Sequence, residues 1–431
     1  MIRITTFLDS FIFLQFFMKS RKLNQWLWKW HFIAGIISLP FVLMLSITGA
    51  IYLFKAEVER PVINNIQTIK NQDNSEKLTY QEQWDLAKQY SKRKLNSVVI
   101  DNEKRSTEFI SGRFGGKQSV YVNPFNGKLS GTFKAKDTWM YTVRKLHGEL
   151  LGGKIGTKLV ELVASWMIVL ILTGLYVWFP FHKGIKGVFT IRLKEGKRML
   201  FRDLHAVVGF WLSGLLLLTL AGGLPWTDIF GGNFKWVQKI TSTGYPKTWS
   251  GKGLTSIEQG KMLLLDDMIT IAKKEKLEGI VTIGLPKNST STFSVSNKTI
   301  NFEKQKMLHF DLYSGVLIKS HTWSDVGFLM RGRMWVMAFH QGEFGPWNWW
   351  LMLGIALGLT LISIAAIFSY ALRKPKKSYG IPKTNTNFKL NSGLTITLIL
   401  IGLILPMFGM SLIIIVLYEK IAAIKKKKIS S

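Results

Sequence analysis

The chain has 431 residues, 47% of them hydrophobic, and a formal net charge of +31. It contains no cysteine, which excludes structural disulfides, thiolate metal sites, iron–sulfur clusters and covalently attached c-type haem. Several stretches of about 20 residues carry almost no charge, which is the length that crosses a bilayer. The basic residues crowd the ends of these stretches, which indicates topology and contact with the lipid bilayer. No nucleic-acid partner is expected, because no DNA- or RNA-binding signature is present.

The chain begins with a segment that resembles a signal peptide only loosely. It lacks a small-residue cleavage site, and Asp9 interrupts its apolar part. We expect it to lie at the membrane interface or inside the cell. The apolar runs and the segments between them predict the following organisation: 1–27 interfacial segment; 28–55 first span; 56–137 first outer domain; 138–180 pre-span helix and second span; 181–201 basic loop; 202–226 third span; 227–330 second outer domain; 331–372 pre-span helix and fourth span; 373–391 basic loop; 392–420 fifth span; 421–431 basic tail.

The predicted fold is an α-helical integral membrane protein with four or five transmembrane helices in two parallel repeats, each with a small α+β outer domain. Each outer segment begins with a helical pattern and continues with strands. The turns fall at Asn126-Gly127 and at Tyr313-Ser314-Gly315. Lysine and arginine crowd the loops at 181–201 and 373–391, which places these loops in the cytoplasm and the outer domains on the opposite side.

The fifth apolar run conflicts with this topology. A full crossing would deliver the four lysines of 425–428 to the outer side, against the charge rule for short tails. A re-entrant arrangement around Pro406 would avoid the conflict. The run is long enough for a crossing, and we therefore expect one.

The two halves of the chain match each other when they are aligned. "WHFIAGIISLPFVLML" aligns with "LHAVVGFWLSGLLLLT", so that His31 matches His205 and each is followed by Gly four residues later. "LHGELLGG" aligns with "FHQGEFGP", so that His147 matches His340. The first pair enters its spans from the cytoplasmic side, and the second pair precedes its spans on the outer side. This pattern predicts a duplication, and the histidines are its main shared polar residues.

Paired histidines on membrane helices are typical of b-type haem, whose iron accepts an imidazole from each side. Glycine near each histidine would let the helices approach closely. A single histidine at a span end is usually structural, and the repeat is what favours a cofactor role here. Cations near the histidines are candidate partners for the anionic haem propionates. These are Arg144, Arg202, Arg331 and Arg333, with Lys29 and Lys145 also nearby in the sequence.

The remaining histidines have no partner in the repeat. His182, His309 and His321 are therefore expected to be structural. No His-Glu-x-x-His, Walker or G-x-G-x-x-G sequence occurs in the required context. The sequence thus predicts neither zinc hydrolysis nor a nucleotide site, and an electron donor would have to be a separate molecule.

Four segments together resemble the bacterial PepSY-associated transmembrane proteins, often called iron-regulated membrane proteins, over about residues 24 to 375. They are "WHFIAGIISLPFVLMLSITGAIYLF", "LHGELLGGKIGTKLVELVASWMIVLILTGLYVWFP", "RDLHAVVGFWLSGLLLLTLAGGLPW" and "HFDLYSGVLIKSH". The family includes inner-membrane ferric-siderophore reductases. The resemblance implies a bacterial cytoplasmic (inner) membrane protein with two periplasmic PepSY-like domains. It also implies haem b, here two haems, with His31, His205, His147 and His340 as axial ligands of the iron.

The resemblance further implies that the protein reduces a ferric siderophore or another iron chelate in iron uptake. Some relatives carry a flavin module that this sequence does not show, so a quinol and a cytoplasmic reductase both stay open as electron donors.

The position of His147 raises a question of distance. His147 precedes the second apolar run by about ten residues, so the two haem irons would lie more than about 30 Å apart. A shorter distance requires that the pre-span helix folds back towards the bilayer or that the spans are longer than the apolar runs. The alternatives are a sensor or scaffold with binding domains, and a chelate transporter, which a broken mid-membrane helix would favour.

Overall fold

The structure is a computed structural model that describes residues 21–69, 76–100, 105–179, 185–384 and 388–429. The described residues form two compact units. The helical unit comprises Met1–Ile47, Gly148–Gly231 and Leu353–Ser431, and the sheet unit comprises Thr48–His147 and Gly232–Met352. Most of the expected interfacial segment, residues 1–20, lies outside the described residues, as does His182.

Four helical segments are long and apolar enough to cross a membrane. The first begins with α2 (Arg21–Leu53) and continues into α3 (Lys55–Gln67), and the second is α6 (Gly153–Trp178). The third combines α7 (Lys197–Asp203), the π-helix η4 (Leu204–Val208), α8 (Gly209–Gly223) and η5 (Leu224–Trp226), and the fourth is α12 (Pro346–Arg373). Together they confirm a multi-pass helical membrane protein.

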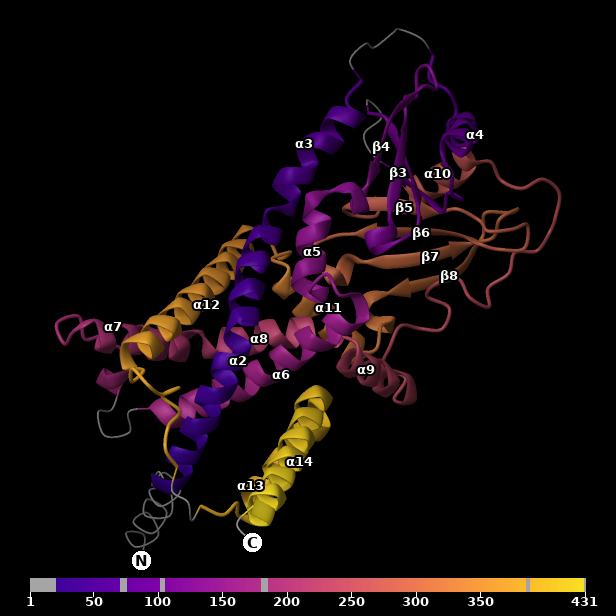
Figure 1. Cartoon of the computed structure of the whole chain (residues 1–431). Helices are drawn as coiled ribbons and strands as arrows, with labels where there is room; N and C mark the ends of the chain where they lie inside the picture. Colours follow the sequence, from indigo (N-terminus) through magenta and orange to yellow (C-terminus); the bar gives the residue numbers. More distant parts are fainter. Residues whose placement is uncertain (1–20, 70–75, 101–104, 180–184, 385–387, 430–431) are drawn as a thin grey trace, which may run out of the picture. The chain divides into compact units, whose positions relative to one another are not determined.

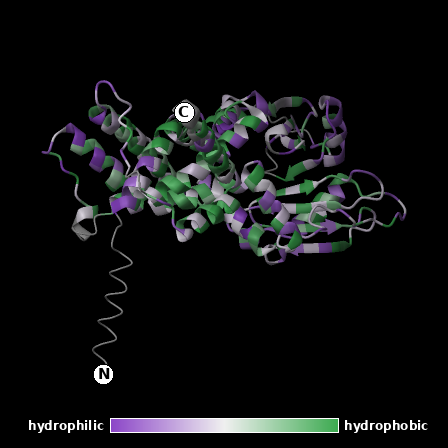
Figure 2. Ribbon diagram, turned by 60° about the horizontal axis from the view of Figure 1, so that its bottom comes forward, coloured by the Kyte–Doolittle hydropathy of each residue, from purple (hydrophilic) through white to green (hydrophobic). Residues whose placement is uncertain are grey.

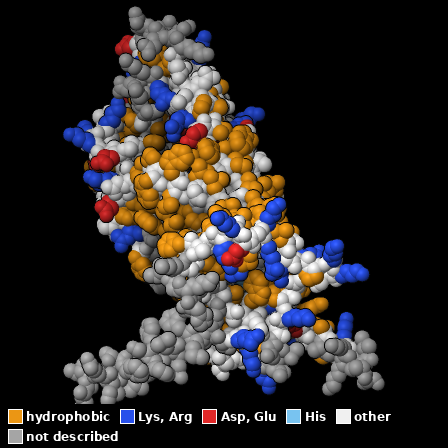
Figure 3. Space-filling view, turned by 90° about the vertical axis from the view of Figure 1, so that its left-hand side faces the viewer, with side chains coloured by type: hydrophobic (Ala, Val, Ile, Leu, Met, Phe, Trp, Pro, Cys, Tyr) orange, Lys and Arg blue, Asp and Glu red, His pale blue; other side chains and the backbone are white. Residues whose placement is uncertain are grey.

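Hydrophobic residues cover the long helices on most sides, as Figure 2 shows. A helix surrounded by lipid has no polar face, and it satisfies its backbone hydrogen bonds internally. In the space-filling view the hydrophobic side chains form a broad continuous area, and lysine and arginine side chains gather beside it (Figure 3). This distribution is the one that the apolar runs and basic loops of the sequence predict.

The last apolar run differs from the single span expected over 392–420. It forms two helices, α13 (Ser392–Ile404) and α14 (Pro406–Ile429), which pack against each other (Figure 1). Gly402 and Gly409 touch across the bend, where a Cβ on Gly402 would lie 3.1 Å from the Gly409 Cα. Proline begins α14 because it cannot continue α13. With 13 residues, α13 spans about 20 Å, less than a bilayer core. The run therefore forms two helices joined at Pro406 rather than one continuous helix.

The sheet unit contains one antiparallel sheet of eight strands in the order β4-β3-β2-β1-β5-β6-β7-β8 (Figure 1). The strands are β1 (Ser97–Ile100), β2 (Thr107–Ser111), β3 (Gln118–Val122), β4 (Leu129–Lys134), β5 (Ile280–Gly284), β6 (Phe293–Lys298), β7 (Lys306–Phe310) and β8 (Leu317–Thr322). Strands β1 and β5 pair, with Val98 opposite Ile283. The two outer segments, expected as separate domains, thus share one sheet.

The core of the sheet unit lies between the strands and the helices α4 (Tyr80–Tyr90) and α10 (Leu265–Lys274). Helix α10 is much shorter than the helical pattern over 254–279 predicted, because Gly260 and the residues before Leu264 adopt irregular backbone. Both expected turns are confirmed, and the Asp311 carboxylate accepts the backbone N–H groups of Tyr313 and Ser314 in the second. Short β1 and β2 were not expected from the sequence.

Two further helices follow the outer strands of this sheet. Helix α5 (Trp139–Glu149) follows β4, and α11 (Phe328–His340) follows β8. The start of α11 is fixed by α9 (Ile229–Ile240) and the segment after it, because Thr243 and Gly244 accept the backbone N–H groups of Met330 and Gly327. Each of α5 and α11 carries one of the candidate histidines in its last turn. The sheet therefore supplies the scaffold from which these two histidines project.

Candidate functional site: two histidine pairs

The helical unit brings His31 and His205 together. His31 lies in α2 and His205 in the π-helix η4, and their ring centroids are 6.4 Å apart with an angle of 73° between the planes. A π-helical turn is rare, and such turns are frequent at functional sites. The pairing of His31 with His205, expected from their matching positions in the sequence, is thus present in space.

Hydrogen bonds to Nδ1 define the protonation of both rings. His205 Nδ1 lies 3.1 Å from the Ile362 carbonyl oxygen, which can only accept, so His205 donates from Nδ1. His31 Nδ1 lies 3.0 Å from the Thr173 hydroxyl, and that hydroxyl donates to the Val169 carbonyl. Thr173 therefore accepts from His31 Nδ1. In a neutral imidazole of this tautomer Nε2 carries the lone pair that can bind a metal.

The glycine that accommodates His31 is not the one expected. A Cβ on Gly174 would lie 3.0 Å from His31 Cε1, so a larger residue would require the imidazole to shift. Gly35 was expected to make room, but a Cβ there would meet only Leu170 at 3.9 Å. A Cβ on Gly209 would meet no atom of the described residues within 4 Å. Gly209, one turn after His205, thus borders open space. No neighbouring helix packs closely there among the described residues, although the sequence predicted one.

An ion pair fixes the chain just before the π-helix. The Asp203 carboxylate accepts three hydrogen bonds from Arg192, from the backbone N–H, Nε and Nη2. Asp203 is only 3% exposed, so this pair is largely shielded from water. The loop 185–196 is thereby tied to the helix that carries His205, two residues later. Asp203 acts on the position of His205 rather than on a ligand.

The sheet unit brings His147 and His340 together in the same way. Their ring centroids are 6.1 Å apart, with an angle of 55° between the planes. His147 Nδ1 lies 3.2 Å from the Thr48 hydroxyl, and a Cβ on Gly49 would lie 3.2 Å from His147 Cε1. Thr48 and Gly49 belong to the first apolar run. His147 therefore lies beside the last residues of this run.

A Thr-Gly dipeptide thus serves one histidine of each pair. Thr173-Gly174 contacts His31, and Thr48-Gly49 contacts His147. The sequence analysis did not identify these residues as functional. The signal was available, since "SITGAIYLF" and "LTGLYVWF" carry the same dipeptide in spans one and two. The dipeptide was not recognised as part of the site because threonine does not bind haem iron. Only the structure shows which histidine each threonine contacts.

The four arginines expected beside the propionates lie in different environments. The Arg144 guanidinium lies 4.9 Å from the centre of the Tyr141 ring and faces Gly115 in the sheet unit. Arg202 is exposed and Arg331 is half-buried. Arg333 is only 6% exposed, two turns before His340 on α11, and burial lowers the pKa of its guanidinium. Their role toward a propionate stays a prediction.

A third histidine pair has a similar spacing but different hydrogen bonds. His309 in β7 and His321 in β8 have ring centroids 6.2 Å apart. Their Nε2 atoms are engaged, by the Trp249 carbonyl for His309 and by the Thr248 hydroxyl for His321. Both rings are almost fully buried, and this burial lowers the pKa of each. The His309 Nδ1 is buried without a hydrogen-bond partner among the described residues, and the structural role of the two histidines stays a prediction.

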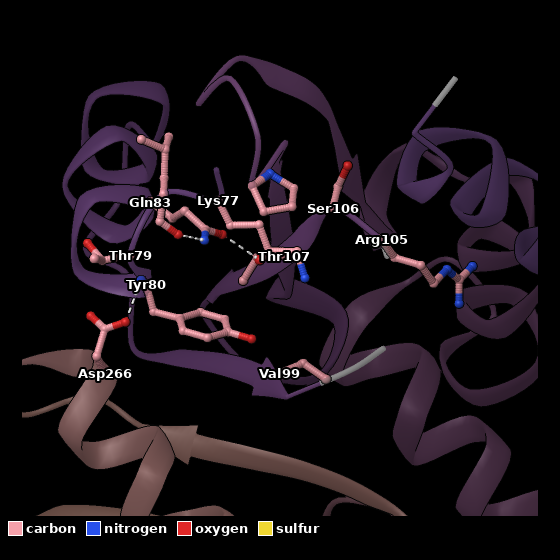
Figure 4. Close-up of a pocket in the computed structure, with 11 residues that line it drawn as sticks. Lys77, Thr79, Tyr80, Gln83, Val99, Arg105, Ser106, Thr107 and Asp266 are labelled. Carbon is pink, nitrogen blue, oxygen red and sulfur yellow. Dashed lines mark hydrogen bonds between the residues drawn. The ribbon is translucent and has the colours of Figure 1, made fainter. Parts of the chain in front are cut away.

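The sheet unit also contains a cavity of about 260 Å³ beside the start of α4 (Figure 4). Asp266 closes one side by accepting the backbone N–H groups of Tyr80 and Gln81. Gln83 accepts a hydrogen bond from the Thr107 hydroxyl and donates to the Leu78 carbonyl. The lining is mostly polar, and it includes no histidine. The polar side chains of this lining can form hydrogen bonds with a small molecule that enters the cavity.

The ring separations of the two histidine pairs, His31–His205 and His147–His340, fit the axial ligands of haem. Two imidazoles that bind one metal ion from opposite sides, with metal–nitrogen bonds of about 2.0 Å, place their ring centroids about 6 Å apart. Among the described residues no three His, Asp or Glu side chains gather as they would for a protein-only metal site. Haem iron requires only one or two protein ligands, because the porphyrin supplies the others. The donor set of each pair is thus compatible with haem.

One comparison with known proteins identifies the family. The model of the PepSY-associated TM region matches residues 28–373, which include all four spans and both histidine pairs. No curated protein matches the chain. The match covers most of the chain, in agreement with the resemblance of its apolar segments. The protein therefore belongs to the PepSY-associated transmembrane family.

Proposed function

We propose that this protein is a haem b-containing membrane oxidoreductase that carries electrons across the bacterial inner membrane to a ferric chelate, such as a ferric siderophore, in iron uptake. The observation that carries the proposal is the geometry of His31 and His205. Their ring separation of 6.4 Å suits two ligands of one iron. Both rings are held in the tautomer that offers Nε2 to a metal.

The pair of His147 and His340 supports a second haem. Its ring separation of 6.1 Å and its Thr-Gly contact repeat the features of the first pair. Each pair takes one histidine from each half of the sequence, at matching positions, which supports the proposal that the chain is a duplicated unit. The order of elements agrees with this, since each half has a span, two helices, four strands, a histidine-bearing helix and a second span.

The proposed direction of electron flow follows from the charges of the sequence. His31 and His205 lie near the basic loops that the charge rule places in the cytoplasm. His147 and His340 follow the segments expected in the periplasm. Bound haem would supply one-electron chemistry, which matches the reduction of Fe³⁺ to Fe²⁺ in a chelate. A quinol or a cytoplasmic reductase would supply the electron.

The roles of the chain's own residues can be assigned within this proposal. His31, His205, His147 and His340 bind iron. Thr173, Thr48 and the Ile362 carbonyl hold the imidazoles in orientation, and such partners raise the basicity of the ligand. The apolar spans exclude water, which helps to set the redox potential.

A second candidate function is a membrane sensor or scaffold whose periplasmic PepSY-like domains bind a partner. The polar cavity beside α4 favours it, because it suits a small ligand and includes no redox group (Figure 4). In that case the buried histidines would be structural.

The two functions are separated by purifying the full-length protein and measuring its haem content and its reaction with a ferric chelate. The reductase predicts a b-type spectrum, reduction of the haem by a quinol or a reductase, and reoxidation on addition of the chelate. A colourless, folded protein, or a haem that the chelate does not reoxidise, would contradict the reductase.

A further inference from the structure

Arg373 is a half-buried cation close to the His31 site, and no acid among the described residues pairs with it. It is the last residue of α12, and its Nη2 is buried without a hydrogen-bond partner among the described residues. A buried guanidinium nitrogen without a partner is costly, so such a group usually indicates a missing ligand or counter-ion. None of the ion pairs between described residues includes Arg373.

Aromatic rings hold Arg373 next to the helix that carries His31. The guanidinium carbon lies 4.7 Å from the centre of the Phe32 ring and 5.9 Å from that of Trp28. The Trp28 ring in turn stacks on His31, with centroids 6.3 Å apart and planes inclined by 19°. Arg373 thus contacts the two aromatic residues that flank His31 on α2. Stacking of this kind fixes the plane of a guanidinium and leaves its edge available for a carboxylate.

Among the described residues, the acids in this region already have partners. The two acids of the loop before His205, Glu195 and Asp203, are both bound by Arg192. The segment 373–391 contains no acid. Arg198 adds a second positive charge in the same region. An oxyanion would therefore gain two cations here without displacing an existing partner.

A second buried polar atom lies on the same face of α2. Asn24, Trp28, His31 and Gly35 recur at helical spacing and share one side of the helix. The Asn24 Oδ1 is buried without a partner among the described residues. This oxygen is an acceptor, so it needs a donor and does not itself bind an anion. The same face of α2 carries the His31 imidazole and the Trp28 ring that Arg373 contacts.

We propose that Arg373 is the anion-binding residue of the His31–His205 site and takes a carboxylate of the cofactor bound there. The proposal rests on the proposed function, because haem supplies the carboxylates as its propionates. It differs from the expectation that Arg202 binds a propionate, since Arg202 is exposed. A lipid phosphate has the same chemistry and is the competing source of the anion.

The test measures the binding of two porphyrins to full-length protein. The His147→Ala, His340→Ala variant serves as the parent, so that only the His31–His205 site is titrated. The haem-free parent, and the same protein with Arg373→Leu, Arg373→Lys or Lys374→Leu, are titrated with haemin and with haemin dimethyl ester, which has no free carboxylate. Lys374→Leu removes an adjacent, exposed charge and is the matched control.

The proposal predicts that Arg373→Leu weakens haemin binding by about 10- to 100-fold, as expected for loss of a charged hydrogen bond. Arg373→Lys should lose less, and Lys374→Leu should bind within about twofold of the parent. The dimethyl ester should bind the parent and Arg373→Leu equally. Native mass spectrometry should show the same retained phosphatidylglycerol in both proteins.

Three results would overturn the proposal. Equal binding of haemin by the parent and Arg373→Leu would show that Arg373 holds no propionate. Equal losses for haemin and its dimethyl ester would show that Arg373 acts on the fold alone. A third result would assign the anion to lipid: Arg373→Leu loses a bound phosphatidylglycerol, while its affinity for haemin falls no more than its affinity for the dimethyl ester. If neither the parent nor the wild-type protein bound either porphyrin, the result would instead reject the proposed function, and this inference with it.

Discussion

The hydroxyl of Thr173 accepts a hydrogen bond from His31 Nδ1 at 3.0 Å and donates its own proton to the Val169 carbonyl at 2.7 Å. This relationship fixes both the rotation and the tautomer of the imidazole. The Thr48 hydroxyl lies in a similar position beside His147 Nδ1. Two threonines therefore orient one histidine in each pair, although they lie in different spans.

Replacing Thr173 or Thr48 by valine should weaken haem binding at the corresponding site. Valine keeps the shape of the side chain and removes the hydroxyl, which leaves the imidazole free to rotate. Loss of such a partner typically costs about 10- to 100-fold in metal affinity. Haem titration of the apo protein measures the change, and the midpoint potential of the remaining haem gives a second readout.

Thr173→Ser provides the matched control, because it keeps the hydroxyl and should bind haem as wild type does within about twofold. If Thr173→Val bound haem as tightly as Thr173→Ser, and with the same midpoint potential, the hydroxyl would have no role at the site.

Gly174→Ala should displace His31. The new Cβ would lie 3.0 Å from His31 Cε1, so the ring has to move. We expect partial loss of haem or conversion to a high-spin spectrum. The control is Gly354→Ala in α12, where a Cβ meets no described atom within 4 Å. This control also replaces a helical glycine by alanine, so it has the same gain in helix propensity as Gly174→Ala. Equal low-spin spectra in the two variants would contradict the close contact.

Asp203→Asn should destabilise the segment that leads into the π-helix. The change leaves Arg192 without its buried carboxylate, and breaking a buried ion pair costs about 3 kcal/mol or more. The midpoint of thermal unfolding in detergent should fall. Glu195→Gln removes an exposed partner of the same Arg192 and should change stability by less than about 1 kcal/mol. Similar midpoints for the two variants would show that Asp203 does not hold this segment.

The sheet unit should lose stability as the pH falls below about 6.5. Burial lowers the pKa of His309 and His321 below their ordinary value of 6.5, so the unfolded chain binds protons more readily than the folded one. The stability from these groups is complete above that value and decreases below it. Lys319 opposes protonation of His321, whereas Asp325 favours it.

Hydrogen exchange of β7 and β8 in the full-length protein measures this effect at pH 7.5 and 5.5, after correction for intrinsic rates. Protection should be lower at pH 5.5, and the His309→Gln, His321→Gln variant should show a smaller pH dependence. An unchanged pH dependence in that variant would assign the effect to other groups.

The sequence predicted the spans and both histidine pairs because each rests on a strong local signal. An apolar run of about 20 residues has few alternatives, and His31, His205, His147 and His340 occupy matching places in the two halves. The last apolar run, expected as one span, forms two helices, because hydropathy does not distinguish a continuous helix from two helices that bend at Pro406.

The contacts around the histidines could not be predicted in the same way. Gly174 and Thr173 lie far from His31 in the sequence, and only the packing of α6 against α2 brings them together. The pairing of β1 with β5 likewise joins segments whose separate patterns resemble two independent domains. Long-range contacts of this kind have no local periodicity that would reveal them.

The central claim is that His31 and His205 bind one haem iron. The most direct test is the absorption spectrum, oxidised and reduced, of the purified His147→Ala, His340→Ala protein with and without the further change of His31 or His205 to alanine. The proposal predicts a low-spin b-type spectrum with one haem per chain in the parent, and its loss or conversion to a high-spin form in each further variant. A parent without haem, or an unchanged low-spin spectrum after either further change, would contradict it.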